Sequence, residues 1–340
     1  MITVKKLVSN SLKWLLPLGL TVLLLYYMFS KVDFVDIWQI LTSGVDYGWI
    51  LCAMTISIFS HVFRALRWRI QLRSLGINPP LMAVVCSIFG TYALNLVFPR
   101  LGEIWRCTYI AEREKKPFTE VVGTMMSDRI TDTLMVLGLT LLTFLVAAPA
   151  IESFLDKYPI GQDVVGMVQN PWNWVILVAI LLIVCGVFYF GRGNKVIIKI
   201  MTWIKEMWRG FATIGSMDGK WAFICYTFAI WGCYFTQLYV AFFAFDFTRD
   251  LCTAPGNALG LLPCLVAFVL SSIGMAVPSN GGLGPWNIAV MFGLAIYGVT
   301  TAQGTAFSIL QWSGQTVMLI ILGLYTIGYI IFDRKKREKR

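Results

Sequence analysis

Long apolar runs separated by short charged segments make up most of this chain. The longest runs cover residues 14–30, 47–63, 118–148, 172–190, 221–245 and 302–332. Their lengths are close to the roughly 20 residues that an α-helix needs to cross a bilayer, whereas a membrane β-barrel would show short alternating strands. The pattern therefore predicts an all-α polytopic membrane protein with about six full spans.

Two further apolar segments are interrupted partway. Residues 80–98 stop at a proline and lead into a short charged piece over 100–112, while residues 258–277 are broken over 278–285 and resume over 286–299. The piece over 100–112 is too short and too polar to cross alone, so each interrupted segment predicts a re-entrant helical hairpin. The residues expected to break the hairpins and to act in gating are Pro99, Gly102, Pro278, Asn280, Gly281, Gly282, Gly284 and Pro285.

Positive charge sets the expected orientation. The chain carries a formal net charge of +10, and with both termini cytoplasmic the outer loops hold only Lys31, Lys157 and Arg249. This bias agrees with the positive-inside rule. In this interpretation the second span ends near Phe63 and has a basic cytoplasmic exit, made of Arg64, Arg67, Arg69 and Arg73. Residues 195–216 are expected to form a basic interfacial helix, and residues 333–340 a polybasic tail.

The same order of elements occurs twice. Residues 47–149 and residues 220–332 each hold a span, a hairpin and a span, in opposite orientations, and Gly-Thr pairs at 123–124 and 304–305 occupy equivalent places. Inverted repeats with discontinuous helices are typical of transporters that bind substrate near the bilayer midplane. We expect residues 1–340 to form one integral membrane domain built on this repeat.

Composition draws attention to the charges that lie inside apolar segments. Hydrophobic residues make up 58% of the 340 positions and charged residues only 14%. An uncompensated ion at the centre of a spanning helix costs roughly 2.5–3.5 kcal/mol, so such ions are paired and usually functional. The candidate substrate-binding residues are Arg100, Glu103, Arg106, Asp128, Arg129 and Asp132. With three charges of each sign, the group is predicted to be internally compensated.

These residue types suit the binding of an anionic head group. Guanidinium groups present a fork of donors that matches a phosphate, and carboxylates would hold the arginines in place while the site is empty. The alternative is that the six charges only fasten the first hairpin to the following helix, as buried ion networks do. The second hairpin is expected to contribute small residues, backbone dipoles and three amide side chains, Asn287, Gln311 and Gln315.

No pattern of catalytic or metal-binding residues accompanies this cluster. The single histidine, His61, lies in an apolar stretch, which favours a structural role, and the eight cysteines lack metal-ligand spacing and are expected to pack. The sequence also has no nucleotide-binding motif. We therefore predict no catalytic residue, no metal and no cofactor.

Three motifs occur in a recognisable order: Pro99-Arg100-x-Gly102-Glu103-x-x-Arg106, Asp128-Arg129-x-x-Asp132 and Pro278-x-x-Gly281-Gly282-Leu283-Gly284. Over roughly residues 10–332 the chain resembles the flippase-like family named for the transmembrane region of lysylphosphatidylglycerol synthase. The resemblance implies a lipid translocase fold that acts on phospholipids, lipid-linked sugars or related anionic amphiphiles. Full synthases add an aminoacyl transferase domain, so synthase activity is not expected here. Many relatives also have an acidic residue where this chain has Asn287.

The function that follows is translocation of an anionic or phosphate-bearing lipid between leaflets, in a prokaryotic cytoplasmic membrane. The expected partners are the lipid substrate and anionic lipids at the basic face, with no nucleic acid. One alternative is a membrane enzyme that modifies lipid head groups, although no Ser/His, Cys/His or metal set supports the carboxylates. Another is a regulatory subunit that does not transport, for which the basic segments would be docking surfaces.

Overall fold

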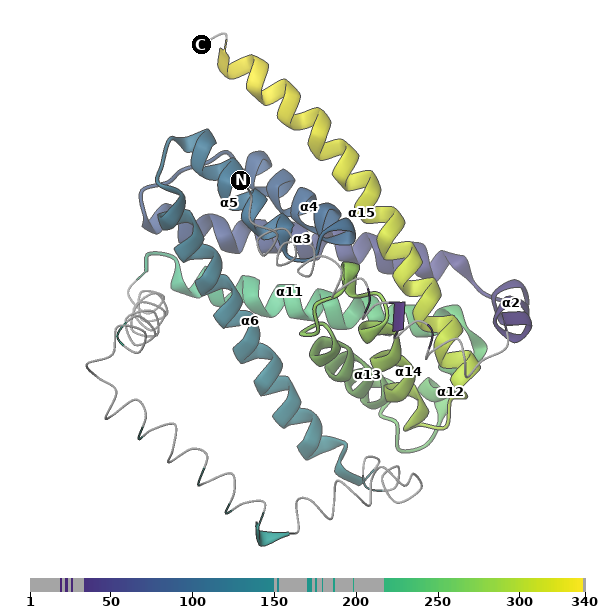
Figure 1. Ribbon diagram of the computed structural model, residues 1–340. Helices are drawn as coiled ribbons and strands as arrows, with labels where there is room; N and C mark the ends of the chain where they lie inside the picture. The colour runs from purple at the N-terminus through teal and green to yellow at the C-terminus, as the bar shows by residue number, and fades with distance from the viewer. Residues whose placement is uncertain are drawn as a thin grey trace, which may run out of the picture. The chain divides into compact units, whose positions relative to one another are not determined.

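The computed structural model describes residues 34–149 and 217–338, together with a few isolated positions elsewhere (Figure 1). The chain divides into two units, residues 1–146 with 217–340 and residues 147–216, and the elements below belong to the first. Regular structure in these ranges is helical, which confirms the all-α class. The spans expected at 14–30 and 172–190, and the interfacial helix expected at 195–216, lie outside the described residues.

Four helices are long and apolar enough to cross a bilayer. They are α3 (Tyr47–Ser74), α6 (Phe118–Val146), α11 (Lys220–Ala241) with the short 3₁₀ turn η2 (Phe242–Ala244), and α15 (Thr301–Glu338). At 1.5 Å per residue, each exceeds the roughly 30 Å of a hydrocarbon core. These helices match four of the six expected spans, although α3 and α15 both extend further than the sequence pattern indicated.

The first interrupted segment forms two helices with a sharp break. Helix α4 (Leu81–Val97) and helix α5 (Leu101–Glu114) are joined by residues 98–100 and pack against each other. Proline cannot continue the backbone hydrogen bonding of α4, and Arg100 next to it adopts a left-handed conformation with φ of 64°. The break predicted at Pro99 is confirmed.

The second interrupted segment repeats this arrangement. Helix α13 (Leu261–Gly274) packs against α14 (Pro285–Ala295), and the residues between them include the 3₁₀ turn η3 (Asn280–Gly282). Two short helices complete the described elements of this unit, α2 (Phe34–Thr42) and α12 (Asp246–Thr253). The break predicted at residues 278–285 is confirmed, and it begins a few residues earlier, after Gly274.

The two breaks are in contact with each other. The side-chain amide of Asn280 donates a hydrogen bond to the carbonyl oxygen of Val97, with a distance of 2.8 Å. Gly281 has φ of 58°, and a Cβ atom there would lie 2.6 Å from a methyl group of Leu96. Trp312 of α15 donates to the carbonyl oxygen of Gly281 at 2.9 Å. The non-helical backbone of the second break is therefore held by both α4 and α15.

The unit has two clusters of buried apolar residues. Trp68, Ile88, Ile110 and Val121 belong to a buried cluster contributed by α3, α4, α5 and α6. A second cluster joins α11, α13, α14 and the first half of α15 with Ile50, Ala53 and Met54 of α3. Helix α3 packs along α11, and α15 packs against α14 and then α4, which ties the two halves together (Figure 1).

Gly102 allows α5 to lie against α4, and replacing it should destabilise the hairpin. A Cβ atom at this position would overlap the carbonyl oxygen of Thr91, and the Gly102 N–H donates to Asn95 Oδ1 at 2.9 Å. We expect Gly102→Ala to lower the free energy of unfolding by about 1–3 kcal/mol, as overpacking does. Thermal unfolding in detergent would measure this.

Gly138 provides the matched control for that substitution. It lies in the middle of α6 and has no atom within 4 Å of the position that a Cβ would take. Alanine favours helix more than glycine does by up to about 1 kcal/mol, so Gly138→Ala should keep or raise the melting temperature. Equal melting temperatures for the two variants would contradict the close approach of α4 and α5.

Candidate functional site

Two aspartates of α6 form the centre of a buried charge cluster. Asp128 is fully buried and Asp132 nearly so. Arg64 of α3 contacts both, since its Nη1 lies 3.2 Å from Asp128 Oδ2 and 2.7 Å from Asp132 Oδ2. Arg67, one turn further along α3, also contacts both, with Nη2 at 2.6 Å from Asp128 Oδ1 and 2.8 Å from Asp132 Oδ1. Each cation thus bridges the two carboxylates.

The buried positions of Arg64 and Arg67 correct the expectation that they form a cytoplasmic exit. Helix α3 continues to Ser74, and both side chains are buried between α3, α6 and α11. Charge can enter this apolar helix because Asp128 and Asp132 neutralise it with short ion pairs. The other two arginines of that group differ, since Arg73 is exposed and Arg69 donates to a backbone carbonyl.

Aromatic and hydroxyl groups from other helices complete the surroundings of these arginines. Nε and Nη2 of Arg64 each lie 3.3 Å from the hydroxyl of Tyr234 on α11, which is 3.4 Å from the hydroxyl of Tyr92 on α4. Arg67 donates to Thr227 Oγ1 at 3.3 Å. The second half of the unit therefore contributes directly to the cluster through α11.

Arg106 is also buried in the cluster, but its pairing is incomplete. Its Nη2 lies 3.6 Å from Asp128 Oδ2, and its guanidinium stacks 4.5 Å above the ring of Trp68. The Trp68 ring is itself held by a hydrogen bond from its Nε1 to Thr124 Oγ1 at 2.9 Å. Among the described residues, Nε and Nη2 of Arg106 have no hydrogen-bond acceptor. Since guanidinium donors normally have partners when buried, this side chain has free capacity for an acceptor.

Glu103 and Arg129 form an ion pair at the exposed edge of the cluster. Glu103 lies on α5 one turn before Arg106, and Arg129 follows Asp128 on α6. The Arg129 side chain is 43% exposed, whereas those of Arg64, Arg67 and Arg106 are buried. This pair joins the first hairpin to α6.

The prediction of internal compensation is wrong. Arg100 is exposed and forms no ion pair in the part of the chain that the structure describes, so it does not count toward the charge of the cluster. Arg64 and Arg67 belong to the cluster instead. The cluster then holds four arginines and three carboxylates, a formal net charge of +1. An excess of buried positive charge with open donors favours an anion.

The amide side chains of the second hairpin have local partners. Asn287 is buried, and its Oδ1 accepts from the Gly284 N–H at 3.1 Å, which caps α14. Gln315 Nε2 donates to Ser57 Oγ of α3 at 3.0 Å. Gln311 is buried, and no described residue donates a hydrogen bond to its Oε1. These contacts fasten α14 and α15, and they do not join the arginine cluster.

Comparison with known proteins identifies the family. The family model described as the lysylphosphatidylglycerol synthase TM region matches residues 14–323. The chain belongs to this family. Membership of the lysylphosphatidylglycerol synthase transmembrane family, together with the four long apolar helices, shows an integral membrane protein. It also confirms the resemblance drawn from the three motifs.

A more distant relative is glycosyltransferase AglD from Haloferax volcanii. It is 28% identical to this member of the lysylphosphatidylglycerol synthase transmembrane family over 139 residues, which are 41% of the chain and 22% of the relative. The chain thus spans about a fifth of the length of that curated protein. No solved structure matches the chain.

His61 extends the polar face of α3 beyond the cluster in this family member. It is buried against the rings of Tyr92 and Phe89, at 4.5 and 6.2 Å between ring centroids, as expected for a structural side chain. Neither ring nitrogen has a hydrogen-bond partner among the described residues. Those residues also hold no group of three His, Cys, Asp or Glu side chains arranged for a metal.

Proposed function

We propose that this protein moves an anionic, phosphate-bearing lipid head group between the leaflets of a membrane, past the arginine cluster. The observation that carries the proposal is Arg106, a buried cation with unfilled donors inside a cluster of net positive charge. Charge-assisted hydrogen bonds from guanidinium groups to phosphate are among the strongest in proteins. A phosphate oxygen would supply the acceptors that Arg106 lacks.

The two layers of the cluster have different roles in this proposal. Arg64 and Arg67 each pair with both Asp128 and Asp132, so these four side chains form a fixed and formally neutral part of the cluster. The pair between Glu103 and Arg129 is partly exposed and can exchange partners at little cost. An arriving head group would replace Glu103 on Arg129 and then reach Arg106, while its hydrocarbon chains remain in lipid. Arg100, exposed at the hairpin break, would meet the same charge.

The membrane topology in this proposal has six full spans and two re-entrant hairpins, with both termini in the cytoplasm of a prokaryotic cell. The matched order of α3, α4, α5 and α6 with α11, α13, α14 and α15 supports inverted repeats over 47–149 and 220–332. The contact between the two breaks also supports it, since half-helices of such repeats meet near the midplane. Residues 195–216 would be the interfacial linker, and residues 333–340 the basic tail.

The basic tail is partly built into the fold. Residues 333–338 continue α15, and Asp333 is buried, where it accepts from Arg113 Nε and Nη2 at 3.1 and 3.0 Å. Arg113 lies near the end of α5, so the last turns of α15 hold the first hairpin.

A head-group modifying enzyme is the second candidate function, favoured by the similarity to the Haloferax volcanii protein, a glycosyltransferase. The geometry of the aspartates argues against chemistry here. Each carboxylate of Asp128 and Asp132 is occupied by two arginines, so neither is available as a general base.

Reconstitution into liposomes tests the proposal. Two fluorescent lipids with identical acyl chains and either a phosphoglycerol or a phosphocholine head would be followed as they leave the inner leaflet. We expect the protein to accelerate exchange of the anionic lipid on the order of tenfold over protein-free liposomes, which is about 1.4 kcal/mol off the barrier. The zwitterionic lipid should gain less. If the protein accelerates the exchange of no anionic lipid, the transport proposal is wrong. If the lipid is recovered chemically altered, the protein is a head-group modifying enzyme.

A further inference from the structure

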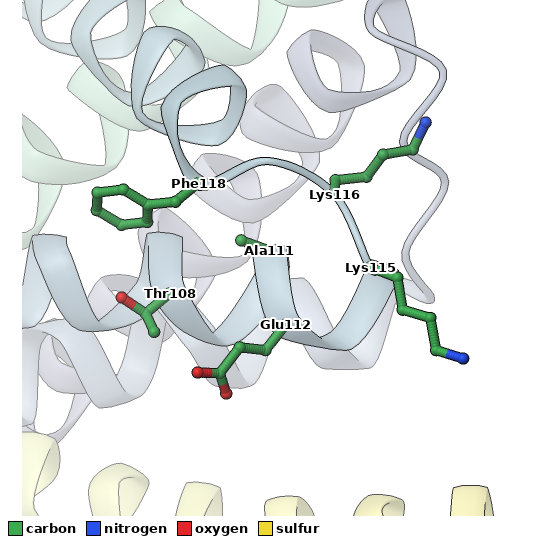
Figure 2. Close-up of a pocket in the computed structure, with 6 residues that line it drawn as sticks. All are labelled: Thr108, Ala111, Glu112, Lys115, Lys116 and Phe118. Carbon is green, nitrogen blue, oxygen red and sulfur yellow. The ribbon is translucent and has the colours of Figure 1, made fainter.

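A pocket of about 440 Å³ opens at the turn between α5 and α6 (Figure 2). Its size is within the range of small-molecule sites. Residues of both helices and of the turn line it: Thr108, Ala111, Glu112, Lys115, Lys116 and Phe118. None of these lining residues belongs to the charge cluster, although Thr108 follows Arg106 by only two positions on α5. The pocket therefore lies outside the charge cluster but on the same two helices.

The backbone of the turn holds two adjacent lysines at the pocket. Lys115 ends α5 in a left-handed conformation with φ of 54° and ψ of 44°, and the N–H groups of Lys115 and Lys116 both donate to the carbonyl oxygen of Ala111. A helix that ends this way usually has glycine at the left-handed position, since a side chain costs about 1 kcal/mol there. This turn places a cation where backbone preference favours glycine.

The two ends of the pocket differ in chemistry. Lys115 and Lys116 lie at one end, where their ammonium groups point away from each other, and the ring of Phe118 and the side chain of Thr108 lie at the other, as Figure 2 shows. Neither lysine forms an ion pair within the described residues, and the Phe118 ring is half-exposed. The Glu112 carboxylate points away from both ammonium groups. A site with cations at one end and an apolar surface at the other matches an amphiphile with an anionic head.

We propose that this pocket binds an anionic phospholipid of the bilayer, with its phosphate at the turn that carries Lys115 and Lys116 and an acyl chain against Phe118. The occupant is a membrane lipid because α6, which begins at the pocket, is one of the four helices long and apolar enough to cross a bilayer. Helices α5 and α6 pack together from the pocket to the pair between Glu103 and Arg129. A lipid bound here therefore lies at one end of the interface between α5 and α6. The site does not depend on transport.

Lipid binding to the full-length protein in detergent tests the site directly. Short-chain phosphatidylglycerol and phosphatidylcholine would be titrated while native mass spectrometry counts the bound lipids. We expect the double variant Lys115→Gln with Lys116→Gln to bind phosphatidylglycerol about thirtyfold more weakly, the factor that two lysine contacts near a membrane surface provide. Binding of phosphatidylcholine should change little.

Matched variants separate this site from general charge effects. Lys335→Gln with Lys336→Gln removes the same charge from the exposed end of α15 and should leave the affinity unchanged. Phe118→Ala should weaken binding of longer-chain lipids more than that of glycerol phosphate, which shares only the head chemistry. An equal loss of phosphatidylglycerol affinity in both double lysine variants, or no loss in either, would overturn the proposal. Full competition by millimolar inorganic phosphate would also overturn it, in favour of a simple anion site.

The same measurements distinguish this inference from the proposed function. Lipid binding is measured without leaflet exchange. If the protein exchanges no lipid but the double variant at Lys115 and Lys116 binds phosphatidylglycerol more weakly as expected, the docking site stands. If the protein exchanges anionic lipid and the two double lysine variants bind that lipid equally well, the proposed transport stands and the docking site is wrong. Melting temperatures of all variants would confirm that each still folds.

Discussion

Replacing Asp128 with alanine is expected to lower the free energy of unfolding by about 3–5 kcal/mol, the usual effect of breaking a buried ion pair from one side. Asp128 is fully buried and lies within 3.6 Å of donor atoms from three arginines, Arg64, Arg67 and Arg106. Without it, Asp132 remains as the one described carboxylate in contact with Arg64 and Arg67, and Arg106 has none. Of the three buried arginines, two would then contact the single carboxylate of Asp132 and Arg106 would contact none.

Thermal or denaturant unfolding of purified protein in detergent would measure this loss. Asp246→Ala is the matched control, because its side chain is 82% exposed and its ion pair with Arg249 is 3.6 Å long. That control should shift stability by no more than about 0.5 kcal/mol. The double variant Arg67→Met with Asp128→Leu should recover part of the loss, since it removes one charge of each sign. Similar stability of Asp128→Ala and Asp246→Ala would contradict the buried network.

The positions of the helix breaks could be predicted from sequence because their causes are local. Proline lacks a backbone donor and glycine permits positive φ, so Pro99 and the segment from Pro278 to Pro285 mark breaks without any knowledge of neighbours. The end of α3 could not be predicted in this way. Arg64 and Arg67 resemble an exit from the membrane until their partners, more than 60 residues later in the chain, are known.

The candidate site could be predicted in part for the same reason. Charges inside apolar segments drew attention to Glu103, Arg106, Asp128, Arg129 and Asp132, which the structure joins in ion pairs. The arginines of α3 were missed, although one signal was present. Two arginines three residues apart and two aspartates four residues apart put one-turn repeats of opposite charge on two apolar helices.

Arg100 shows where spacing is misleading. It lies three residues from Glu103, which suggested a shared helix face, but α5 begins only at Leu101 and Arg100 precedes it with φ of 64°. A residue outside the helix does not follow helical spacing, so its side chain is exposed while Glu103 pairs with Arg129. The backbone at a break, rather than the sequence interval, decides which charges meet.

The contrast between arginines that contact two carboxylates and an arginine that contacts one separates stability from function. Arg64 and Arg67 each contact two carboxylates, so their removal should mainly cost stability. Arg129 has one ion-pair partner among the described residues and is partly exposed, and ion pairs of that kind contribute about 0–1 kcal/mol. A large effect of Arg129 on transport with a small effect on stability would therefore point to contact with the lipid.

Arg129→Ala is expected to reduce exchange of the anionic lipid at least about tenfold, the effect of losing one charged contact of about 1.4 kcal/mol, while the free energy of unfolding changes by less than about 1 kcal/mol. The liposome assay measures the first quantity and unfolding in detergent the second. Arg249→Ala is the matched control, because that arginine is 46% exposed and also has a single ion pair. It should leave exchange unchanged.

Exchanging the two charges decides between a lipid contact and a simple fastener. The double variant Arg129→Glu with Glu103→Arg restores an ion pair between α5 and α6 but moves the cation to the hairpin and puts a carboxylate beside Asp128. If the head group must meet a cation on α6, the double variant should remain as slow as Arg129→Ala. If the pair only fastens the hairpin, exchange should recover to the wild-type rate, because the fastening contact is present again.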